Sequence, residues 1–547
     1  MSIPAELRDA AYRWIADDID EATKAELQQV LARALGGDPA ARDDLADRMA
    51  GPLKFGTAGL RGPVRAGPNG MNRAVVVRTT AGVASWLQAN GHGGGLVVVG
   101  RDARRGSEAF AADAAGVLAA AGFDVRLLSR PLPTPVLAFA VRHLGAVAGI
   151  QITASHNPAP DNGYKLYDAS GAQIIPPADT EIEAAIAEVS SAHAVPRATT
   201  YQTLADDVVE AYLEQVAQVP RLSARDIRIA VTALHGVGAQ TAAEAFRRAG
   251  FTDVHFTQDT PDPDFGGMTF PNPEEPGACD ELLALARRID ADIAIAFDPD
   301  ADRCAVGVPD GSADGGWRML SGDETGGLLG EHVLATEPTT EGVLVATTIV
   351  SSSLLKSIAA AHGAQYTETL TGFKWLARAG DNLVFAYEEA LGLCVDPAAV
   401  RDKDGISAAL MVAGLAAARK AAGSSLLEGL DELARRHGVH LTQQISIRLG
   451  SPAQAAERVA QLRAEPPATL AGTPAELDDL RPRTDGIRLL ADGLRVVVRP
   501  SGTEPKLKAY LQVVQPVPAD DQLAASRREA ERKMSALRAD VRQLLGA

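Results

Sequence analysis

The sequence has few cysteines and no long hydrophobic run. Only three cysteines occur in 547 residues, and none of them forms a CxxC pair that could bind zinc, so we expect free thiols. No stretch approaches the roughly 20 apolar residues that a membrane-spanning helix requires. The segment that starts at Met1 also lacks the basic region and apolar core of a secretory signal. The sequence therefore predicts a cytoplasmic protein.

Basic and aromatic residues are also scarce. Lysine and arginine number 53 against 70 aspartates and glutamates, which gives a formal net charge of −17 at pH 7, and aromatic residues make up 4%. This charge repels nucleic acid and anionic membranes, and no basic stretch with interleaved aromatic residues offsets it. We therefore expect no nucleic-acid or membrane partner, while protein partners stay unknown. An anionic ligand would need a locally basic site.

The length and the recurring patterns predict several domains, since 547 residues exceed one hydrophobic core. Helical spacing of apolar residues predicts a helical N-terminal extension over residues 1–50. Beyond it, a short apolar strand, a polar loop, an Ala-rich helix and a second strand recur three times. The predicted fold class is α/β, with three similar mixed α/β domains and a smaller C-terminal α+β domain around a central cleft. The predicted domains are I at 51–205, II at 206–315, III at 316–435 and IV at 436–547, with a surface loop at 464–482.

Each of the three copies contains a second, buried-looking strand that ends in a polar cluster. The strands are predicted at 146–151, 293–297 and 383–387, and the clusters lie at 153–158, 298–303 and 388–392. In open α/β sheets, ligands bind beyond the carboxyl ends of the strands. Three such clusters therefore predict one shared cleft, with three ordinary turns as the alternative.

The second cluster, residues 298–303, reads Asp-Pro-Asp-Ala-Asp-Arg. Carboxylates at alternate positions of a turning loop can point at one hard cation and leave coordination positions for a phosphate oxygen. Mg²⁺ suits this set better than Ca²⁺, because the longer EF-hand spacing with its distal Glu is missing. The pattern predicts Asp298, Asp300 and Asp302 as metal ligands, with a solvated acidic turn as the alternative.

The first cluster places Ser155 directly after a buried strand, between Thr153 and His156, with Lys165 further along. This is a suitable setting for an activated hydroxyl. The surrounding residues do not match the GxSxG elbow of acyl hydrolases, which ranks acyl chemistry lower. Without a metal cluster, a plain turn before Pro158 would explain the same residues equally well.

Two further clusters suit phosphate and hydroxyl groups. Residues 499–506 read Arg-Pro-Ser-Gly-Thr-Glu-Pro-Lys, a tight turn whose backbone N–H groups can form an anion nest between Arg499 and Lys506. Glu388 and Glu389 can accept hydrogen bonds from vicinal sugar hydroxyls. Such turns and paired acids also occur without any ligand.

With these four clusters in this order, the sequence resembles the α-D-phosphohexomutase superfamily from about residue 50 onward. The resemblance implies an isomerase, an intramolecular phosphotransferase that interconverts a sugar 1-phosphate and a sugar 6-phosphate of glucose and/or mannose. It also implies a phosphoserine, a bisphosphorylated intermediate, Mg²⁺, and a sugar 1,6-bisphosphate as activator. Residues 56–62, 161–165 and 401–404 look most like the phosphoglucomutase–phosphopentomutase branch.

The resemblance also implies individual roles. Ser155 would be the phosphoserine and, through its phosphate, would join the three aspartates as a metal ligand. The other implied catalytic residues are Arg61, His156, Lys165, Arg303 and Lys403, of which Lys403 would transfer a proton at the accepting hydroxyl. The implied substrate-binding residues are Thr371, Gly372, Lys374, Glu388, Glu389, Arg499, Ser501, Gly502, Thr503 and Lys506. Ala390 stands where many relatives have Ser, so the sugar stays open.

Three alternatives to this function remain at the level of sequence. They are a phosphopentomutase of the same family, a metal-dependent phosphatase that uses the same serine, and a sugar-phosphate sensor without turnover. A phosphatase would release inorganic phosphate instead of an isomer. A sensor would bind the sugar phosphate without exchange of a Ser155 phosphate.

Overall fold

The computed structural model describes residues 3–56, 59–500 and 506–546, which form two compact units. Unit 1 contains the residues through Pro220, Arg225–Ala305 and Asp396–Ala413. Unit 2 contains Arg221–Ala224, Val306–Val395 and the residues from Gly414 onward. The chain thus leaves unit 1 and later returns to it with Asp396–Ala413.

The N-terminal segment of unit 1 is helical, as predicted, and packs around its own small core. Its helices are α1 (Ala5–Asp17), α2 (Glu21–Leu35) and α3 (Pro39–Arg48). Asp20 and Asp38 are the N-caps of α2 and α3, and their side chains accept hydrogen bonds from free backbone N–H groups of the first turn. Leu27, Leu31 and Leu45 are buried in one cluster between the helices.

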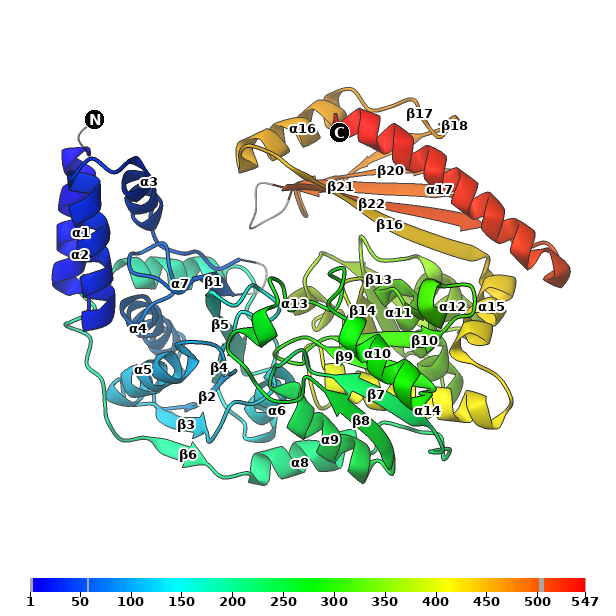
Figure 1. The fold of residues 1–547 in the computed structure, drawn as a ribbon, viewed down its shortest axis with the longest axis horizontal. Helices are drawn as coiled ribbons and strands as arrows, with labels where there is room; N and C mark the ends of the chain where they lie inside the picture. Colours follow the sequence, from blue (N-terminus) through cyan, green and yellow to red (C-terminus); the bar gives the residue numbers. More distant parts are fainter. Residues whose placement is uncertain (1–2, 57–58, 501–505, 547) are drawn as a thin grey trace. The chain divides into compact units, whose positions relative to one another are not determined.

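Domain I is a six-stranded sheet with helices on both faces, in the order β1-β5-β4-β2-β3-β6 (Figure 1). Val97 and Val99 of β2 belong to a core shared with α4 and α5. On the other face, a Cβ atom at Gly149 of β4 would meet Val141 of α6. The elements are β1 (Leu60–Pro63), α4 (Arg73–Ala89), β2 (Leu96–Arg101), α5 (Ser107–Ala120), β3 (Asp124–Leu128), α6 (Thr134–His143), β4 (Ala148–Ile152), β5 (Asp161–Asp168), α7 (Ala178–Ala187) and β6 (Gln202–Leu204).

Domains II and III contain two further sheets, with the orders β11-β10-β9-β7-β8 and β13-β12-β14-β15. The elements around the first sheet are α8 (Asp207–Val216), β7 (Arg228–Thr232), α9 (Gly238–Arg248), β8 (Asp253–Thr257), η1 (Phe265–Gly267), α10 (Asp280–Ile289), β9 (Ile293–Phe297), β10 (Cys304–Pro309), η2 (Asp314–Gly316) and β11 (Trp317–Met319). Around the second are α11 (Gly322–Thr336), β12 (Leu344–Thr348), α12 (Leu354–His362), β13 (Gln365–Thr369), α13 (Phe373–Leu376), β14 (Leu383–Glu388), β15 (Gly392–Cys394), α14 (Gly405–Ala421) and α15 (Leu426–His437).

The three sheets share one strand arrangement, which confirms the prediction of three similar mixed α/β domains. The shared orders are β3-β2-β4-β5, β8-β7-β9-β10 and β13-β12-β14-β15. In domains I and III the first three of these strands are parallel and the fourth is antiparallel. The loops that follow β4, β9 and β14 therefore occupy equivalent places, and they contain the three polar clusters.

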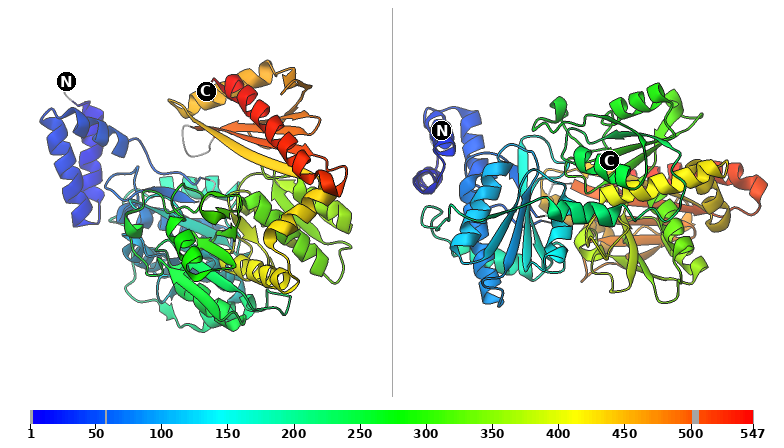
Figure 2. Two further views of the ribbon diagram at one scale, coloured as in Figure 1. Left: turned by 45° about the vertical axis from the view of Figure 1, so that its right-hand side comes forward. Right: turned by 90° about the horizontal axis from the view of Figure 1, so that it is seen from below.

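Domain IV is an antiparallel sheet covered on one face by α16 and α17 (Figure 2), which confirms the predicted α+β domain. Its elements are β16 (Val439–Arg448), α16 (Pro452–Ala464), β17 (Thr469–Leu470), β18 (Thr473–Pro474), β19 (Glu476–Asp479), β20 (Ile487–Ala491), β21 (Leu494–Pro500), β22 (Lys506–Gln515), η3 (Asp520–Gln522) and α17 (Leu523–Leu545). The prediction of a plain surface loop at 464–482 was wrong. This segment contains three short strands. β17 and β18 pair with each other, and β19 pairs with the edge of β20, so that their backbone hydrogen-bonding groups are satisfied.

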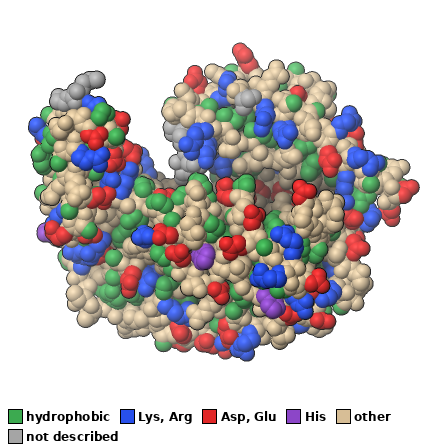
Figure 3. Space-filling view, in the orientation of Figure 1, with side chains coloured by type: hydrophobic (Ala, Val, Ile, Leu, Met, Phe, Trp, Pro, Cys, Tyr) green, Lys and Arg blue, Asp and Glu red, His purple; other side chains and the backbone are tan. Residues whose placement is uncertain are grey.

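The structure agrees with the expectation of free thiols. All three cysteines are free and buried. On the face drawn in Figure 3, acidic and basic side chains of the described residues are interspersed. Within the described ranges, no single helix has the length and hydropathy to span a membrane, and only α14 and α15, bent by 90° at their junction, meet those requirements as a pair.

The buried core of the N-terminal helices predicts a stability difference between two leucines of α2. Leu27 is 0% exposed and Leu35 is 51% exposed. We expect Leu27→Ala to destabilise this helical segment by about 2–5 kcal/mol, because it leaves a cavity, whereas Leu35→Ala should cost about 0.5 kcal/mol or less. Hydrogen exchange of residues 5–48 measures both effects, and equal protection in the two variants would contradict the assigned core.

Candidate active site

Ser155 lies in the loop of residues 153–158, here called the serine loop, between β4 and β5. Its side chain is buried and its backbone adopts the left-handed conformation, with a φ of 53°. The hydroxyl of Thr153 accepts a hydrogen bond from the Ser155 N–H at 2.9 Å. Gly163 of β5 lies so close that a Cβ atom there would be 2.5 Å from the carbonyl oxygen of Thr153. Close packing of β5 thus supports a strained conformation at Ser155.

The Ser155 hydroxyl lies between a carboxylate and an imidazole. Its Oγ donates to Oδ2 of Asp298 at 2.8 Å and lies 3.2 Å from Nδ1 of His156. Burial, followed by the positive charges of Arg303 and Arg61, lowers the pKa of His156 well below its usual value. His156 is therefore neutral near pH 7, and a neutral imidazole can accept a proton from Oγ.

The three aspartates follow β9 in the loop of residues 298–303, here called the aspartate loop. Asp298, Asp300 and Asp302 are all buried, and one carboxylate oxygen from each lies within 4.8 Å of the others. Among the described residues, Oδ1 of Asp300 and Oδ1 of Asp302 are buried without a hydrogen-bond partner. Buried carboxylate oxygens without partners are costly, and a hard divalent cation would satisfy them. The donor set therefore fits Mg²⁺.

Two lysines partly balance this charge. Nζ of Lys165 lies 2.6 Å from Oδ2 of Asp300 and 2.8 Å from Oδ2 of Asp302, and Nζ of Lys403 lies 3.3 Å from the same atom of Asp302. Burial lowers the pKa of Lys165, but the two carboxylates outweigh it and raise that pKa above its usual value. Burial and the neighbouring aspartates raise the pKa of Asp298 well above its usual range. The lysines therefore compensate Asp300 and Asp302 more than Asp298.

Lys403 reaches this site because Asp396–Ala413 belongs to unit 1. The neighbouring Asp402 accepts hydrogen bonds from the Tyr167 hydroxyl at 2.8 Å and from Nε2 of Gln173 at 2.9 Å. Gly405 permits close contact with the aspartate loop, since a Cβ atom there would lie 2.4 Å from the carbonyl oxygen of Arg303. The segment is thus anchored on both sides of Lys403.

Both predicted arginines also lie beside the serine and aspartate loops. Nη1 of Arg61 donates to Oδ1 of Asn157 in the serine loop at 3.2 Å. The backbone N–H of Arg303 donates to Oδ1 of Asp298 at 3.1 Å, and its side chain lies 3.9 Å from Asp302. Unit 1 thus brings together every residue predicted as catalytic or metal-binding: Ser155, His156, Lys165, Arg61, Arg303, Lys403, Asp298, Asp300 and Asp302.

Sequence reasoning missed several residues that contact this group, among them Thr134 and Asp402. The hydroxyl of Thr134, at the start of α6, donates to Oδ2 of Asp300 at 2.5 Å. Asp402 lies in the segment 401–404, and its carboxylate is 3.5 Å from Nζ of Lys403. No local pattern in the sequence indicates that Thr134 pairs with Asp300 or Asp402 with Tyr167, because these partners lie in distant parts of the chain.

Unit 2 contains the predicted sugar-binding glutamates, in the loop after β14. Oε2 of Glu389 accepts hydrogen bonds from the hydroxyl of Ser351 at 2.9 Å and from that of Thr348 at 3.2 Å. Burial, followed by the charges of Glu388 and Asp323, raises the pKa of Glu389 to about 7. This carboxyl therefore changes its charge near neutral pH.

Unit 2 also contains the other described residues that were predicted to bind substrate. Nη1 of Arg499 donates to the hydroxyl of Thr371 at 2.8 Å, which joins the ends of β13 and β21. Gly372 has a φ of 106° and precedes α13, which contains Lys374. Lys506 begins β22, opposite Arg448 of β16. The predicted residues Ser501, Gly502 and Thr503 lie outside the described residues.

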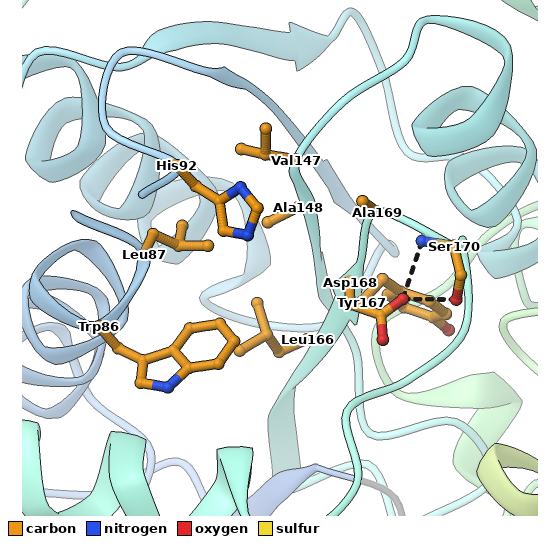
Figure 4. A pocket seen from close by; sticks show the side chains of 10 residues that line it. All are labelled: Trp86, Leu87, His92, Val147, Ala148, Leu166, Tyr167, Asp168, Ala169 and Ser170. Carbon is orange, nitrogen blue, oxygen red and sulfur yellow. Dashed lines mark hydrogen bonds between the residues drawn. The ribbon is translucent and has the colours of Figure 1, made fainter. Parts of the chain in front are cut away.

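Domain I also contains a pocket of about 280 Å³ (Figure 4). Its lining residues are Trp86, Leu87, His92, Val147, Ala148, Leu166, Tyr167, Asp168, Ala169 and Ser170. Ala148 begins β4 and Asp168 ends the antiparallel β5, whereas Ser155 follows the other end of β4. Nε1 of Trp86 already donates to Glu181, and Oδ1 of Asp168 already accepts from Ser170. The pocket is thus distinct from the serine site.

Comparison with known proteins identifies the family. Four family models match, described as phosphoglucomutase/phosphomannomutase domains I, II, III and C-terminal, at residues 52–193, 210–311, 321–436 and 452–530. A Haemophilus influenzae protein named "Probable phosphomannomutase" is 41% identical over 81% of this chain and 93% of its own length. A Mus musculus phosphopentomutase is 34% identical over 81% of this chain and 76% of its own length.

The solved structures show the same fold. A phosphoglucomutase/phosphomannomutase family protein from Burkholderia thailandensis has a TM-score of 0.68 at 21% identity, covering 88% of this chain and 97% of its own. The chain therefore belongs to the phosphoglucomutase/phosphomannomutase family. The prediction of a phosphosugar mutase, an isomerase, is confirmed.

The aspartate loop predicts metal binding that depends on its buried carboxylates. We expect Asp300→Asn to weaken the binding of Mg²⁺, or of Mn²⁺ as a spectroscopic probe, by at least about 10-fold, because it removes a charged ligand. Titration calorimetry or Mn²⁺ electron paramagnetic resonance measures the affinity. Asp280→Asn is the charge-matched control, because Asp280 is exposed in the same domain. Equal affinity in the two variants would refute the site.

The raised pKa of Glu389 predicts a pH-dependent step in substrate use. Below pH 7 the carboxyl is protonated, and above it the carboxylate can accept hydrogen bonds from sugar hydroxyls. We expect kcat/KM of the wild type to rise as pH rises through about 7, relative to that of Glu389→Gln on the same substrate. Because the charge of Glu388 contributes to the shift, Glu388→Gln should move the rise to lower pH. A wild-type to Glu389→Gln ratio that stays constant from pH 5.5 to 8.5 would contradict this role.

Proposed function

We propose that this mutase transfers a phosphoryl group through Ser155 and interconverts the 1-phosphate and 6-phosphate of glucose and/or mannose. The observation that carries the proposal is the position of Ser155 Oγ, held between Asp298 and a neutral His156 and beside the aspartate triad. Phosphoryl transfer depends mainly on positioning and on charge compensation, and these groups supply both.

In the first half of the proposed reaction, a sugar hydroxyl oxygen attacks the phosphorus of phospho-Ser155. The P–Oγ bond breaks, Oγ leaves with the electron pair and takes a proton, and the hydroxyl loses its own proton. The products are Ser155 and a sugar bisphosphate. In the second half, Ser155 Oγ loses its proton and attacks the phosphorus of the other phosphate. The P–O bond to the sugar breaks, and the sugar oxygen leaves with the electron pair and takes a proton, which restores phospho-Ser155 and releases the isomer.

The side chains of unit 1 divide this work. Nδ1 of His156, 3.2 Å from Oγ, accepts the Oγ proton when Ser155 attacks and returns that same proton when Oγ next leaves phosphorus. Lys165 and Arg303 compensate negative charge. Lys403 transfers the proton at the sugar hydroxyl that accepts the phosphoryl group. Asp298, Asp300 and Asp302 would hold Mg²⁺, which when bound supplies charge compensation at the transferring phosphoryl group.

The residues of unit 2 are proposed to recognise the part of the substrate that does not react. Glu388 and Glu389 accept hydrogen bonds from sugar hydroxyls. Arg499, Ser501, Gly502, Thr503 and Lys506 bind the second phosphate, and Thr371, Gly372 and Lys374 belong to a further substrate-binding loop. A sugar 1,6-bisphosphate is the proposed activator because it can phosphorylate Ser155, and the cytoplasm is the proposed location.

A pentose phosphate is the second candidate substrate. It is supported by the phosphopentomutase of Mus musculus, which is 34% identical to this chain. The hexose is preferred because the family models that match all four segments carry the names phosphoglucomutase and phosphomannomutase. A comparison of kcat/KM for glucose, mannose and ribose 1-phosphates decides between them.

The serine mechanism predicts that Ser155→Ala loses at least about 1,000-fold in kcat, because the acceptor oxygen is gone. Purified protein with Mg²⁺, each sugar 1-phosphate and a trace of the bisphosphate is assayed for both the isomer and inorganic phosphate. Ser190→Ala is the control, because Ser190 is exposed in the same domain.

Two outcomes would contradict the proposal. Release of inorganic phosphate in place of an isomer would indicate a phosphatase that uses the same serine. Full activity of Ser155→Ala would remove this serine from the mechanism.

A further inference from the structure

Arg104 makes the densest set of hydrogen bonds to the serine loop among the described side chains. Its Nη2 donates to the carbonyl oxygens of Ser155 at 2.5 Å and Asn157 at 2.6 Å. Its Nη1 donates to those of Pro158 at 2.8 Å and Asp161 at 3.0 Å. One guanidinium thus binds three carbonyl groups of the serine loop and a fourth at the start of β5.

Burial makes these contacts a constraint on the loop. The Arg104 side chain is 0% exposed, so water does not replace it as a donor to the loop carbonyls. A guanidinium presents its N–H groups in one plane with fixed angles, whereas a lysine ammonium is a compact charge with three rotating donors. The positions of the four carbonyl oxygens are therefore set by the plane of Arg104.

Arg104 is itself held by Asp102, which is also buried. Oδ1 of Asp102 accepts from the Arg104 N–H at 2.9 Å and from the Ser107 hydroxyl at 2.6 Å, while Oδ2 lies 3.3 Å from Nε of Arg104. Within the loop, the Thr153 hydroxyl accepts a hydrogen bond from the Ser155 N–H. Asp102 therefore supports the loop through Arg104.

Domain II contributes a second support. The guanidinium carbon of Arg104 lies 4.7 Å from the centroid of the Phe265 ring, a distance at which a cation is attracted to the ring face. Phe265 belongs to the same unit as Arg104. The guanidinium is thus held by an ion pair with Asp102 and by an aromatic ring.

We propose that Arg104 is a positioning residue that fixes the backbone of the serine loop and so keeps Ser155 Oγ aligned for phosphoryl transfer. This inference rests on the proposed function of Ser155. Ser155 adopts a left-handed conformation that a serine rarely prefers, and the bonds of Arg104 to residues 155–161 maintain it. Arg104 would then act on the chemical step and not on sugar binding.

The test compares Arg104→Lys and Arg104→Ala with the wild type. We expect kcat to fall about 100-fold in both variants, the loss that a nucleophile displaced by about 1 Å would produce, with KM within about threefold. Guanidinium chloride at about 20 mM should raise the kcat of Arg104→Ala at least about 10-fold, because free guanidinium fits the vacated site. Methylammonium chloride at the same concentration should not.

The matched control is Arg105→Ala. Arg105 is the next residue, carries the same charge and pairs with Asp264, but its guanidinium is exposed and none of its described bonds reaches residues 153–158. We expect this variant to retain kcat within about twofold. Hydrogen exchange adds a readout that does not require turnover. Amides of residues 153–163 should exchange faster in Arg104→Lys than in Arg105→Ala, while the rest of domain I stays unchanged.

The outcomes separate this inference from the proposed function. A wild type that isomerises none of the three sugar phosphates would refute the proposed function. Amide hydrogen exchange of residues 153–163 would then still decide whether Arg104 holds the loop. An active wild type with kcat of Arg104→Lys within twofold would overturn the positioning role. The positioning role would also be overturned if the loss of kcat in the Arg104 variants equalled the fraction of unfolded protein and guanidinium did not restore activity.

Discussion

The burial of three carboxylates in the aspartate loop is the constraint on which the rest of unit 1 depends. Removing a carboxylate from water costs several kcal/mol unless cations and hydrogen bonds replace the lost hydration. Lys165 and Lys403 supply two cations, and Thr134 and Ser155 supply hydroxyl donors. Two carboxylate oxygens still have no hydrogen-bond partner among the described residues, which is the electrostatic condition for a divalent cation. The Ser155 hydroxyl donates to Asp298 of the same loop, so the proposed metal site and the proposed nucleophile share one set of charges.

Repetition of one α/β plan explains why polar loops follow β4, β9 and β14. In each case the chain must leave the third parallel strand and enter the next strand within a few residues. Each loop contains a non-glycine residue in the left-handed conformation, namely Ser155 with φ 53°, Ala301 with φ 54° and Leu391 with φ 64°. Such a conformation costs roughly 1–3 kcal/mol and persists only where its surroundings determine it. At Ser155 these surroundings are Gly163, Thr153 and Arg104, which explains how a strained serine is kept in place.

The two units contain different parts of the proposed chemistry. Unit 1 contains the nucleophile, the metal-ligand candidates and the cations, and its contacts are short and buried. Unit 2 contains Glu389, whose pKa of about 7 depends on burial and on Glu388 and Asp323, together with the Thr371–Arg499 hydrogen bond. Phosphoryl transfer needs fixed charges, whereas discrimination between sugars depends on a few hydroxyl contacts. This division is consistent with the names of the matching proteins. The family model is named for both phosphoglucomutase and phosphomannomutase, and one relative is named phosphopentomutase.

The sequence by itself determined the fold class, the three similar domains, and the chemical identity of the main clusters. It could do so because strand periodicity and the contiguous Asp-Pro-Asp-Ala-Asp and Thr-Ala-Ser-His-Asn motifs are local. It failed at residues 464–482, where β19 pairs with β20 and where β17 and β18 pair with each other. Only the tertiary structure placed Lys403 beside Asp302, Thr134 beside Asp300, and Arg104 beside three carbonyls of the serine loop. These contacts join distant segments through burial and charge pairing, and no local periodicity or spacing encodes which partners will meet.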